Sequence, residues 1–97
     1  MRDQRRFEIV VWIKKSAAFA TLRDEVVDLA KDEPFESTEY ESTVDFHWRF
    51  DTLHEAEGTA EALTTLCDRP ELVLLRLLNY DNLDASTTFK DARRVEH

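Results

Sequence analysis

Hydrophobic and polar positions follow two different periods along this chain, and these periods predict its elements. The continuous apolar run of Phe7–Lys15 is typical of a central strand whose two faces are both at least partly covered. A helical period follows, with Ser16 as its expected N-cap, and it ends at Glu33 because the residue before Pro34 is pushed out of the helical region. Strict alternation over Glu39–Asp51 then predicts a strand with one buried and one exposed face.

The second half of the chain repeats the order of helix and strand. Thr52 and Glu55 fit a capping box at the start of a helix. Gly58 lies inside this helix, where it costs about 1 kcal/mol relative to alanine, and a close approach of helix to sheet would explain it. Leu72–Tyr80 is a further apolar strand. The apolar stripe expected to be buried by the helix consists of Leu53, Ala56, Ala60, Leu63 and Leu66.

These elements predict one α+β domain over residues 1–80. If residues 35–39 form a short strand that folds back through a turn at 40–42, the order is βαββαβ. That order resembles a ferredoxin-like sandwich, an antiparallel sheet with two helices on one face. Without the short strand, the fallback is a three-stranded βαβαβ sheet. The polar segment 81–97 is either an edge strand around Thr87–Lys90 or a disordered tail, and pairing would bury Phe89.

The sheet face away from the helices is expected to carry apolar side chains. If Ile9, Val11 and Ile13 face the helices, Val10 and Trp12 fall on the open face. Leucines of the last strand are expected to join them there. An apolar patch of this kind suits a homodimer packed sheet to sheet, or a ligand held between sheets. The leucines in question are Leu72, Leu74 and Leu78.

Composition narrows the classes of function. The chain of 97 residues has a net charge of −8, and residues 16–57 hold twelve acids against three bases. Such a field repels nucleic acid and anionic lipid and attracts basic proteins. The terminal arginines Arg2, Arg5, Arg6, Arg93 and Arg94 are interpreted as solvated ends. With one glycine in the chain, a glycine-rich phosphate loop is excluded, so no cofactor is expected. A single cysteine and the lack of a long apolar run favour a cytoplasmic location, away from membranes.

An acidic row on the alternating segment is the first candidate site. It could form one coherent docking surface for a basic protein, with Trp12 as an apolar anchor. The alternative is that these charges keep the protein soluble and protect a sheet edge. The candidate partner-binding residues are Glu36, Glu39, Glu41 and Asp45, with Asp51 continuing the row.

Asp45 and His47 are the strongest candidates for chemistry because, on a strand, they share a face about 6–7 Å apart. With His54 they are weak metal-ligand candidates, and a carboxylate beside an imidazole can act as an acid–base pair. The simpler interpretation is a solvated strand face. Cys67 lies beside Asp68 at a helix end, which disfavours a thiolate.

The sequence therefore ranks three functions. The first is a non-enzymatic interaction or regulatory module, a homodimer or the partner of a basic protein. The second is a small-molecule-sensing domain, and the third is a small metal-dependent enzyme that relies on Asp45, His47 and His54.

Overall fold

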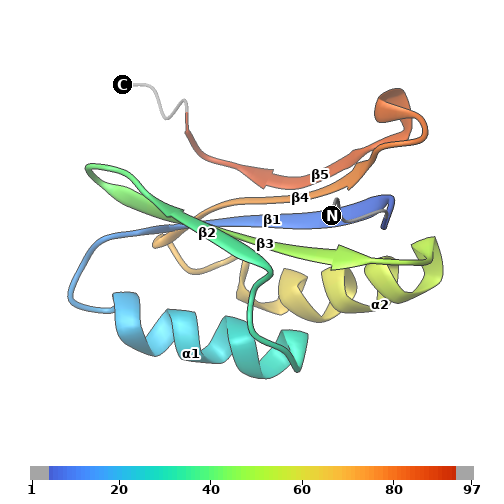
Figure 1. The fold of residues 1–97 in the computed structure, drawn as a ribbon. Coiled ribbons are helices and arrows are strands. Elements are labelled where there is room, and N and C mark those ends of the chain that lie inside the picture. Colours follow the sequence, from blue (N-terminus) through green and yellow to red (C-terminus); the bar gives the residue numbers. More distant parts are fainter. Residues whose placement is uncertain (1–4, 94–97) are drawn as a thin grey trace.

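A computed structural model describes residues 5–93 of the chain (Figure 1). Within this range an antiparallel sheet of five strands, in the order β2-β3-β1-β4-β5, packs against two α-helices. The predicted α+β class and antiparallel sheet are confirmed, and the three-stranded fallback is wrong because β2 is present. The elements are β1 (Phe7–Lys14), α1 (Phe19–Ala30), β2 (Glu36–Glu39), β3 (Thr43–Phe50), α2 (Leu53–Leu63), β4 (Leu72–Asn79) and β5 (Thr87–Asp91).

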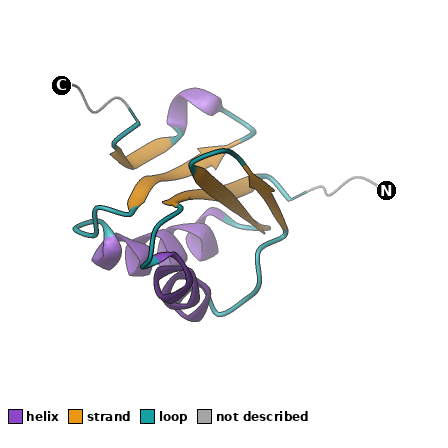
Figure 2. Cartoon of the chain, turned by 90° about the vertical axis from the view of Figure 1, so that its left-hand side faces the viewer, coloured by secondary structure: helices purple, strands orange, loops and turns teal. Residues whose placement is uncertain are grey.

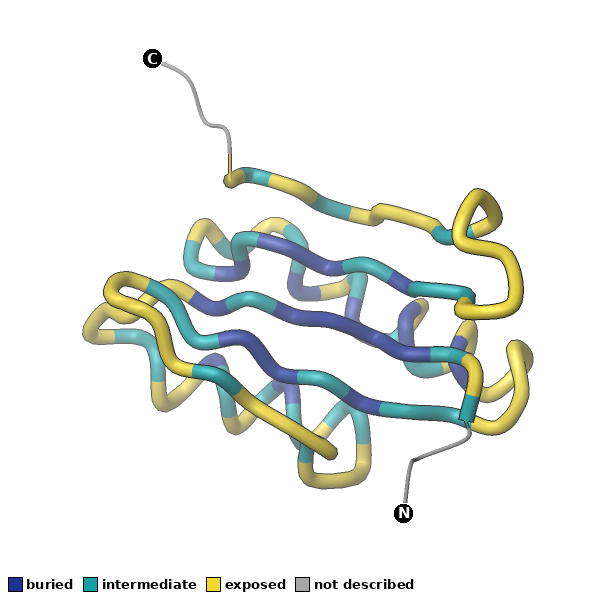
Figure 3. The backbone as a smooth tube through the Cα atoms, turned by 45° about the horizontal axis from the view of Figure 1, so that its top comes forward, coloured by how far each residue is buried: buried dark blue, intermediate teal, exposed yellow. Residues whose placement is uncertain are grey.

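The hydrophobic core lies between β1 and the two helices. Ile9, Val11 and Ile13 on β1 are completely buried and pack against Leu22 and Val26 of α1, among others. Figure 2 shows both helices on the same side of the sheet, so one sheet face is covered and the other is open. Burial is accordingly greatest along the central strands and declines towards the edge strands β2 and β5 (Figure 3).

The first helix begins later than the sequence predicts. Ser16 is not its N-cap; the Ser16 side chain instead accepts a hydrogen bond from the backbone N–H of Ala18. The backbone N–H of Phe19, where α1 starts, bonds to the Ser16 carbonyl. At the other end Lys31 adopts a left-handed conformation with φ of 61°, which stops α1 before Pro34 is reached.

The second helix is capped as predicted, because the Thr52 side chain accepts the backbone N–H of Glu55. Two expectations for this helix are wrong. Leu53 is 40% exposed, since it stands at the first helical position, before the helix reaches the sheet. Gly58 does not mark a close approach, because a Cβ placed there would meet no described atom within 4 Å.

A bulge in β4 changes which leucines face the helices. Leu72 pairs with Ile13, and Leu74 pairs with Trp12, so Val73 is the extra residue. Leu72 therefore joins the core beneath the helices, and its predicted place on the open face is wrong. Leu74 takes that position instead.

The segment after residue 80 adds β5, which pairs antiparallel with β4. Phe89 on this strand is 38% exposed, so the expectation that pairing would bury it is wrong. A second irregularity in register, between Leu75 and Arg76, leaves Phe89 without a directly opposite residue on β4. The alternating strand β3 is also shorter than expected, and Tyr40 lies in the exposed turn before it.

The Gly58→Ala variant tests the account of α2. Because the added methyl group meets open space and alanine favours the helical interior, we expect the free energy of unfolding to rise by about 1 kcal/mol. Urea denaturation measures this change, with Ala62→Gly as the matched change of opposite sign in the same helix. A loss of stability in Gly58→Ala would contradict the open space around residue 58.

Candidate functional site: the open face of the sheet

The pairing register decides which side chains share the open face. On β1 and β3, Glu8 pairs with Arg49, Val10 with His47, and Trp12 with Asp45. Because side chains alternate along a strand, all six project from the face that the helices leave uncovered. The predicted positions of Val10 and Trp12 are confirmed by this register. The open face thus combines apolar, charged and aromatic groups.

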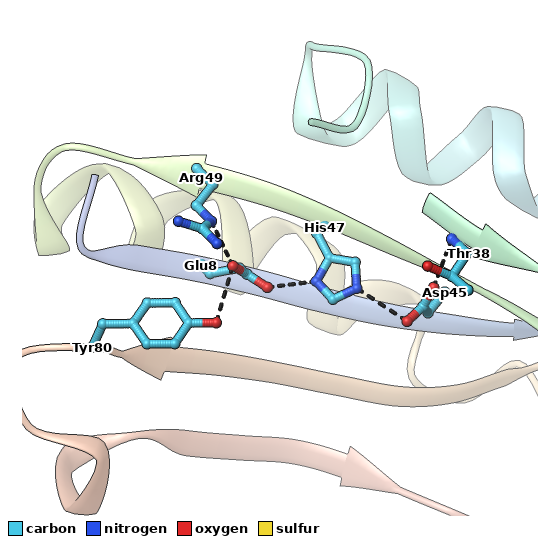
Figure 4. Close-up of polar contacts among 6 residues, drawn as sticks. All are labelled: Glu8, Thr38, Asp45, His47, Arg49 and Tyr80. Atoms are coloured by element: carbon cyan, nitrogen blue, oxygen red, sulfur yellow. Dashed lines mark hydrogen bonds and ion pairs between the residues drawn. The ribbon is translucent and has the colours of Figure 1, made fainter. Parts of the chain in front are cut away.

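The centre of this face is a buried carboxylate, Glu8, of which only 3% is exposed. Its Oε2 lies 2.5 Å from Nδ1 of His47, and its Oε1 accepts a hydrogen bond of 3.1 Å from the hydroxyl of Tyr80 (Figure 4). Nε of Arg49 lies 2.6 Å from the same Oε1 in an ion pair. We call the set of Glu8, Asp45, His47, Arg49 and Tyr80 the charge cluster.

His47 is held between two carboxylates. Besides Glu8, its Nε2 lies 3.0 Å from Oδ2 of Asp45, and Oδ1 of Asp45 accepts the backbone N–H of Thr38 on β2 at 2.8 Å. The hydrogen bond to Glu8 raises the pKa of His47 to about 9, against the opposing effect of burial and with further help from Asp45. His47 is therefore a cation at neutral pH that donates a proton to each carboxylate.

The charges of the cluster compensate one another. Burial on its own would raise the pKa of Glu8, but the hydrogen bond and charge of His47, with Arg49 and Tyr80, hold that pKa below its usual value. The Nε–H of Arg49 does not point along a hydrogen bond, so its contact with Glu8 is an ion pair without good alignment. Two carboxylates thus face two cations within a small volume, which is the condition for burying charge without a large penalty.

This geometry limits the chemistry of Asp45 and His47. Both imidazole nitrogens are engaged, and a histidine with a pKa near 9 is a poor general base at neutral pH. His54 lies on α2, which packs on the opposite face. Within residues 5–93, no group of three or more His, Cys, Asp or Glu side chains is placed to hold a metal ion.

Aromatic side chains surround the charge cluster. The rings of Trp12 and Tyr40 have centroids 5.8 Å apart, and the guanidinium carbon of Arg93 lies 5.2 Å from the Trp12 centroid. Arg49 is placed 5.3 Å from the ring centroids of both Phe35 and Tyr80. Tyr40 and Tyr80 remain 48% and 44% exposed, so large apolar surfaces reach solvent here.

The predicted acidic row does not form one surface. Glu36 pairs with His47 and Asp45 is 96% buried on the open face, whereas Glu39 is one position out of phase and forms a 2.7 Å ion pair with Lys15. Glu41 lies exposed in the turn between β2 and β3. The expectation of a coherent acidic face is wrong because alternation along β2 separates its members.

Most of the negative charge lies instead in the helical layer. The segments 16–35 and 51–71, which contain α1 and α2, hold eleven acidic residues against three basic ones. All other segments together hold ten of each. The sheet side is therefore close to neutral, and the net charge of −8 belongs to the helical side.

The remaining candidates show no catalytic arrangement. Burial raises the pKa of Cys67, Lys90 opposes this effect and Asp68 adds to it, which agrees with the expected lack of a thiolate. Of the terminal arginines, Arg2 and Arg94 lie outside the described residues. Arg5 donates to the carbonyl of Arg49, Arg6 forms an ion pair with Asp81, and Arg93 one with Asp91.

Sequence reasoning missed three members of the charge cluster: Glu8, Arg49 and Tyr80. Glu8 offered a signal, because it is an acid between Phe7 and Ile9 in an otherwise apolar run. A charge on a central strand requires compensation from neighbouring strands. Which neighbour supplies it depends on the strand order, and the sequence does not state that order.

Comparison with protein-family models, with curated proteins and with solved structures found no match to this chain. Among residues 5–93, no helix has both the length and the apolar character needed to cross a bilayer. The functional argument therefore rests on the geometry above.

The pH dependence of stability tests the state of His47. Its pKa is about 9 in the folded chain and near 6.5 when unfolded, so its stabilising effect is complete below about pH 6.5 and is lost as pH rises through 9. The difference corresponds to about 3 kcal/mol. We expect His47→Gln to abolish this fall in unfolding free energy, measured by urea denaturation at several pH values. His54→Gln is the control that keeps it; equal slopes for both variants would refute the assignment.

The Glu8→Gln variant tests which carboxylate controls His47. Glu8 is the first cause of the raised pKa, so its neutralisation should return the pKa of His47 towards its ordinary value. NMR titration of the His47 ring protons measures this shift. Asp45→Asn should lower the pKa by less. The reverse ranking of the two variants would contradict the central place of Glu8.

Proposed function

We propose that this protein is a non-enzymatic interaction module that works as a homodimer, with the open faces of two sheets packed together. The observation that carries this proposal is the separation of charge from aromatic surface. The sheet side is near neutral and presents Trp12, Tyr40 and Tyr80, while the helical side carries the net negative charge. Two copies that meet through their sheets keep their acidic helical layers apart, so repulsion is least in this arrangement.

The area of the open face is sufficient for such a dimer. The strands β1, β3 and β4 have eight residues each, and β2 and β5 have four and five. At about 3.3 Å per residue and about 4.8 Å between strands, they cover roughly 500 Å² per copy. Two copies would bury about 1,000 Å², before the relief of the side chains is counted, which reaches the lower range of specific interfaces.

We further propose that β1 to β4 with the two helices form a ferredoxin-like βαββαβ unit to which β5 is added. The order β2-β3-β1-β4 and the common face of the helices support this arrangement. The small-molecule-sensing and metal-dependent alternatives stay predictions. No described contact favours a specific ligand for either of them.

Substitutions of exposed aromatic residues test the dimer. We expect Trp12→Glu and Tyr40→Glu each to raise the dissociation constant of the dimer at least about tenfold, because large aromatic groups dominate binding energy at interfaces. Sedimentation equilibrium measures the constant. Phe89→Ser, an exposed aromatic on β5 outside the aromatic patch, is the matched control and should leave it unchanged.

Salt separates this dimer from a complex with a basic protein. Added salt screens the repulsion between two acidic helical layers and should strengthen the dimer, whereas it weakens the pairing of opposite charges. A wild-type protein that stays monomeric at every concentration and salt level would refute the proposal. Dimerisation that both aromatic variants leave unchanged would place the interface elsewhere.

A further inference from the structure

A groove runs between α2 and the outer strands of the sheet, on the side opposite the open face. One wall is a face of α2 from His54 to Thr64, and the floor is made by Leu77 of β4 with Thr87 and Phe89 of β5. The groove has a volume of about 520 Å³. At about 1.5 Å per helical residue, its length along α2 is roughly 15 Å. This shape fits an elongated occupant.

The floor and the rim of the groove differ in polarity. Leu77 and Phe89 present an apolar floor, and Phe89 remains partly exposed although it belongs to a paired strand. The rim on α2 carries Glu57 and Glu61, spaced four residues apart on the same helical face. An apolar floor with an acidic rim complements an apolar stripe flanked by basic side chains.

The fold favours a helix over a strand as occupant. The edge of β5 is a poor template for strand addition, because it has five residues and its pairing with β4 contains an irregularity. The end of the groove beyond Thr64 is fixed by Lys90, whose ammonium group donates to the carbonyls of Cys67 and Arg69. A helix beside α2 would extend the helical layer over the outer strands.

We infer that this groove, which we call the α2–β5 groove, is a docking site for a basic amphipathic helix of a partner protein. The surface is separate from the open face, and the inference does not depend on dimer formation. It gives the predicted basic partner a place on the molecule. The acidic charge that attracts this partner lies on α2 rather than on the strand β2.

The test uses a synthetic helix as a probe, composed of leucine and lysine in an amphipathic pattern. It should have about fifteen residues, because shorter isolated helices are marginal in water. The control peptide has glutamate in place of every lysine. Titration into isotopically labelled protein, followed by amide NMR shifts, locates the site and confirms that each variant is folded.

We expect the basic peptide to shift the amides of α2 and β5 and the acidic peptide to shift neither. The double variant Glu57→Lys with Glu61→Lys, and the single variant Phe89→Ser, should each weaken binding at least about tenfold. The matched charge reversal Asp24→Lys with Asp28→Lys has the same spacing on exposed positions of α1 and should keep most of the affinity. Trp12→Glu should keep all of it.

Three outcomes would overturn the inference. The first is the absence of binding by the wild-type protein. The second is an equal loss of affinity in the α1 and α2 charge reversals, which would mean general attraction to an acidic protein. The third is a set of shifts on the open face instead of the groove. Because Trp12→Glu affects the dimer and Phe89→Ser the groove, failure of one proposal is distinguishable from failure of the other.

Discussion

The open face of this protein is organised by the burial of one carboxylate, that of Glu8. A charge on a central strand is tolerated only when opposite charges and hydrogen-bond donors surround it. Here β3 supplies His47 and Arg49, and the residue after β4 supplies the Tyr80 hydroxyl. Through Asp45 the network reaches the backbone of β2. A single buried charge therefore links four strands across a face on which no helix packs, and it fixes the orientation of the surrounding side chains.

The same cluster shows how a carboxylate–imidazole pair can be structural. Asp45 and His47 have the residue types of an acid–base pair, yet a second carboxylate occupies the other imidazole nitrogen. Two negative neighbours stabilise the protonated ring, so the histidine acts as a fixed cation over the physiological range. This fixed cation allows two carboxylates to be buried side by side, and it ties the stability of the fold to pH on the alkaline side.

The two sides of the molecule differ because they meet different demands. The helical side faces solvent and carries the excess of acidic residues, which lie on the outer surfaces of α1 and α2. The sheet side is near neutral and aromatic, which suits contact with a second surface of the same kind. The α2–β5 groove combines both characters, with an apolar floor from the sheet and an acidic rim from the helix. Self-association and partner binding would therefore use separate parts of the protein.

Local patterns in the sequence determined the elements and the core. The alternation that buries Phe46 and Trp48, the apolar run around Val11 and the cap at Thr52 each depend on nearest neighbours in the chain, so the sequence alone predicts them. Only the tertiary structure decided the rest. A bulge moved Leu72 to the core, alternation on β2 separated Glu36 from Glu39, and the strand order brought Glu8 to His47. These contacts join residues far apart in the chain. Their formation depends on pairing register, which a one-residue shift inverts and which periodicity along a single strand does not specify.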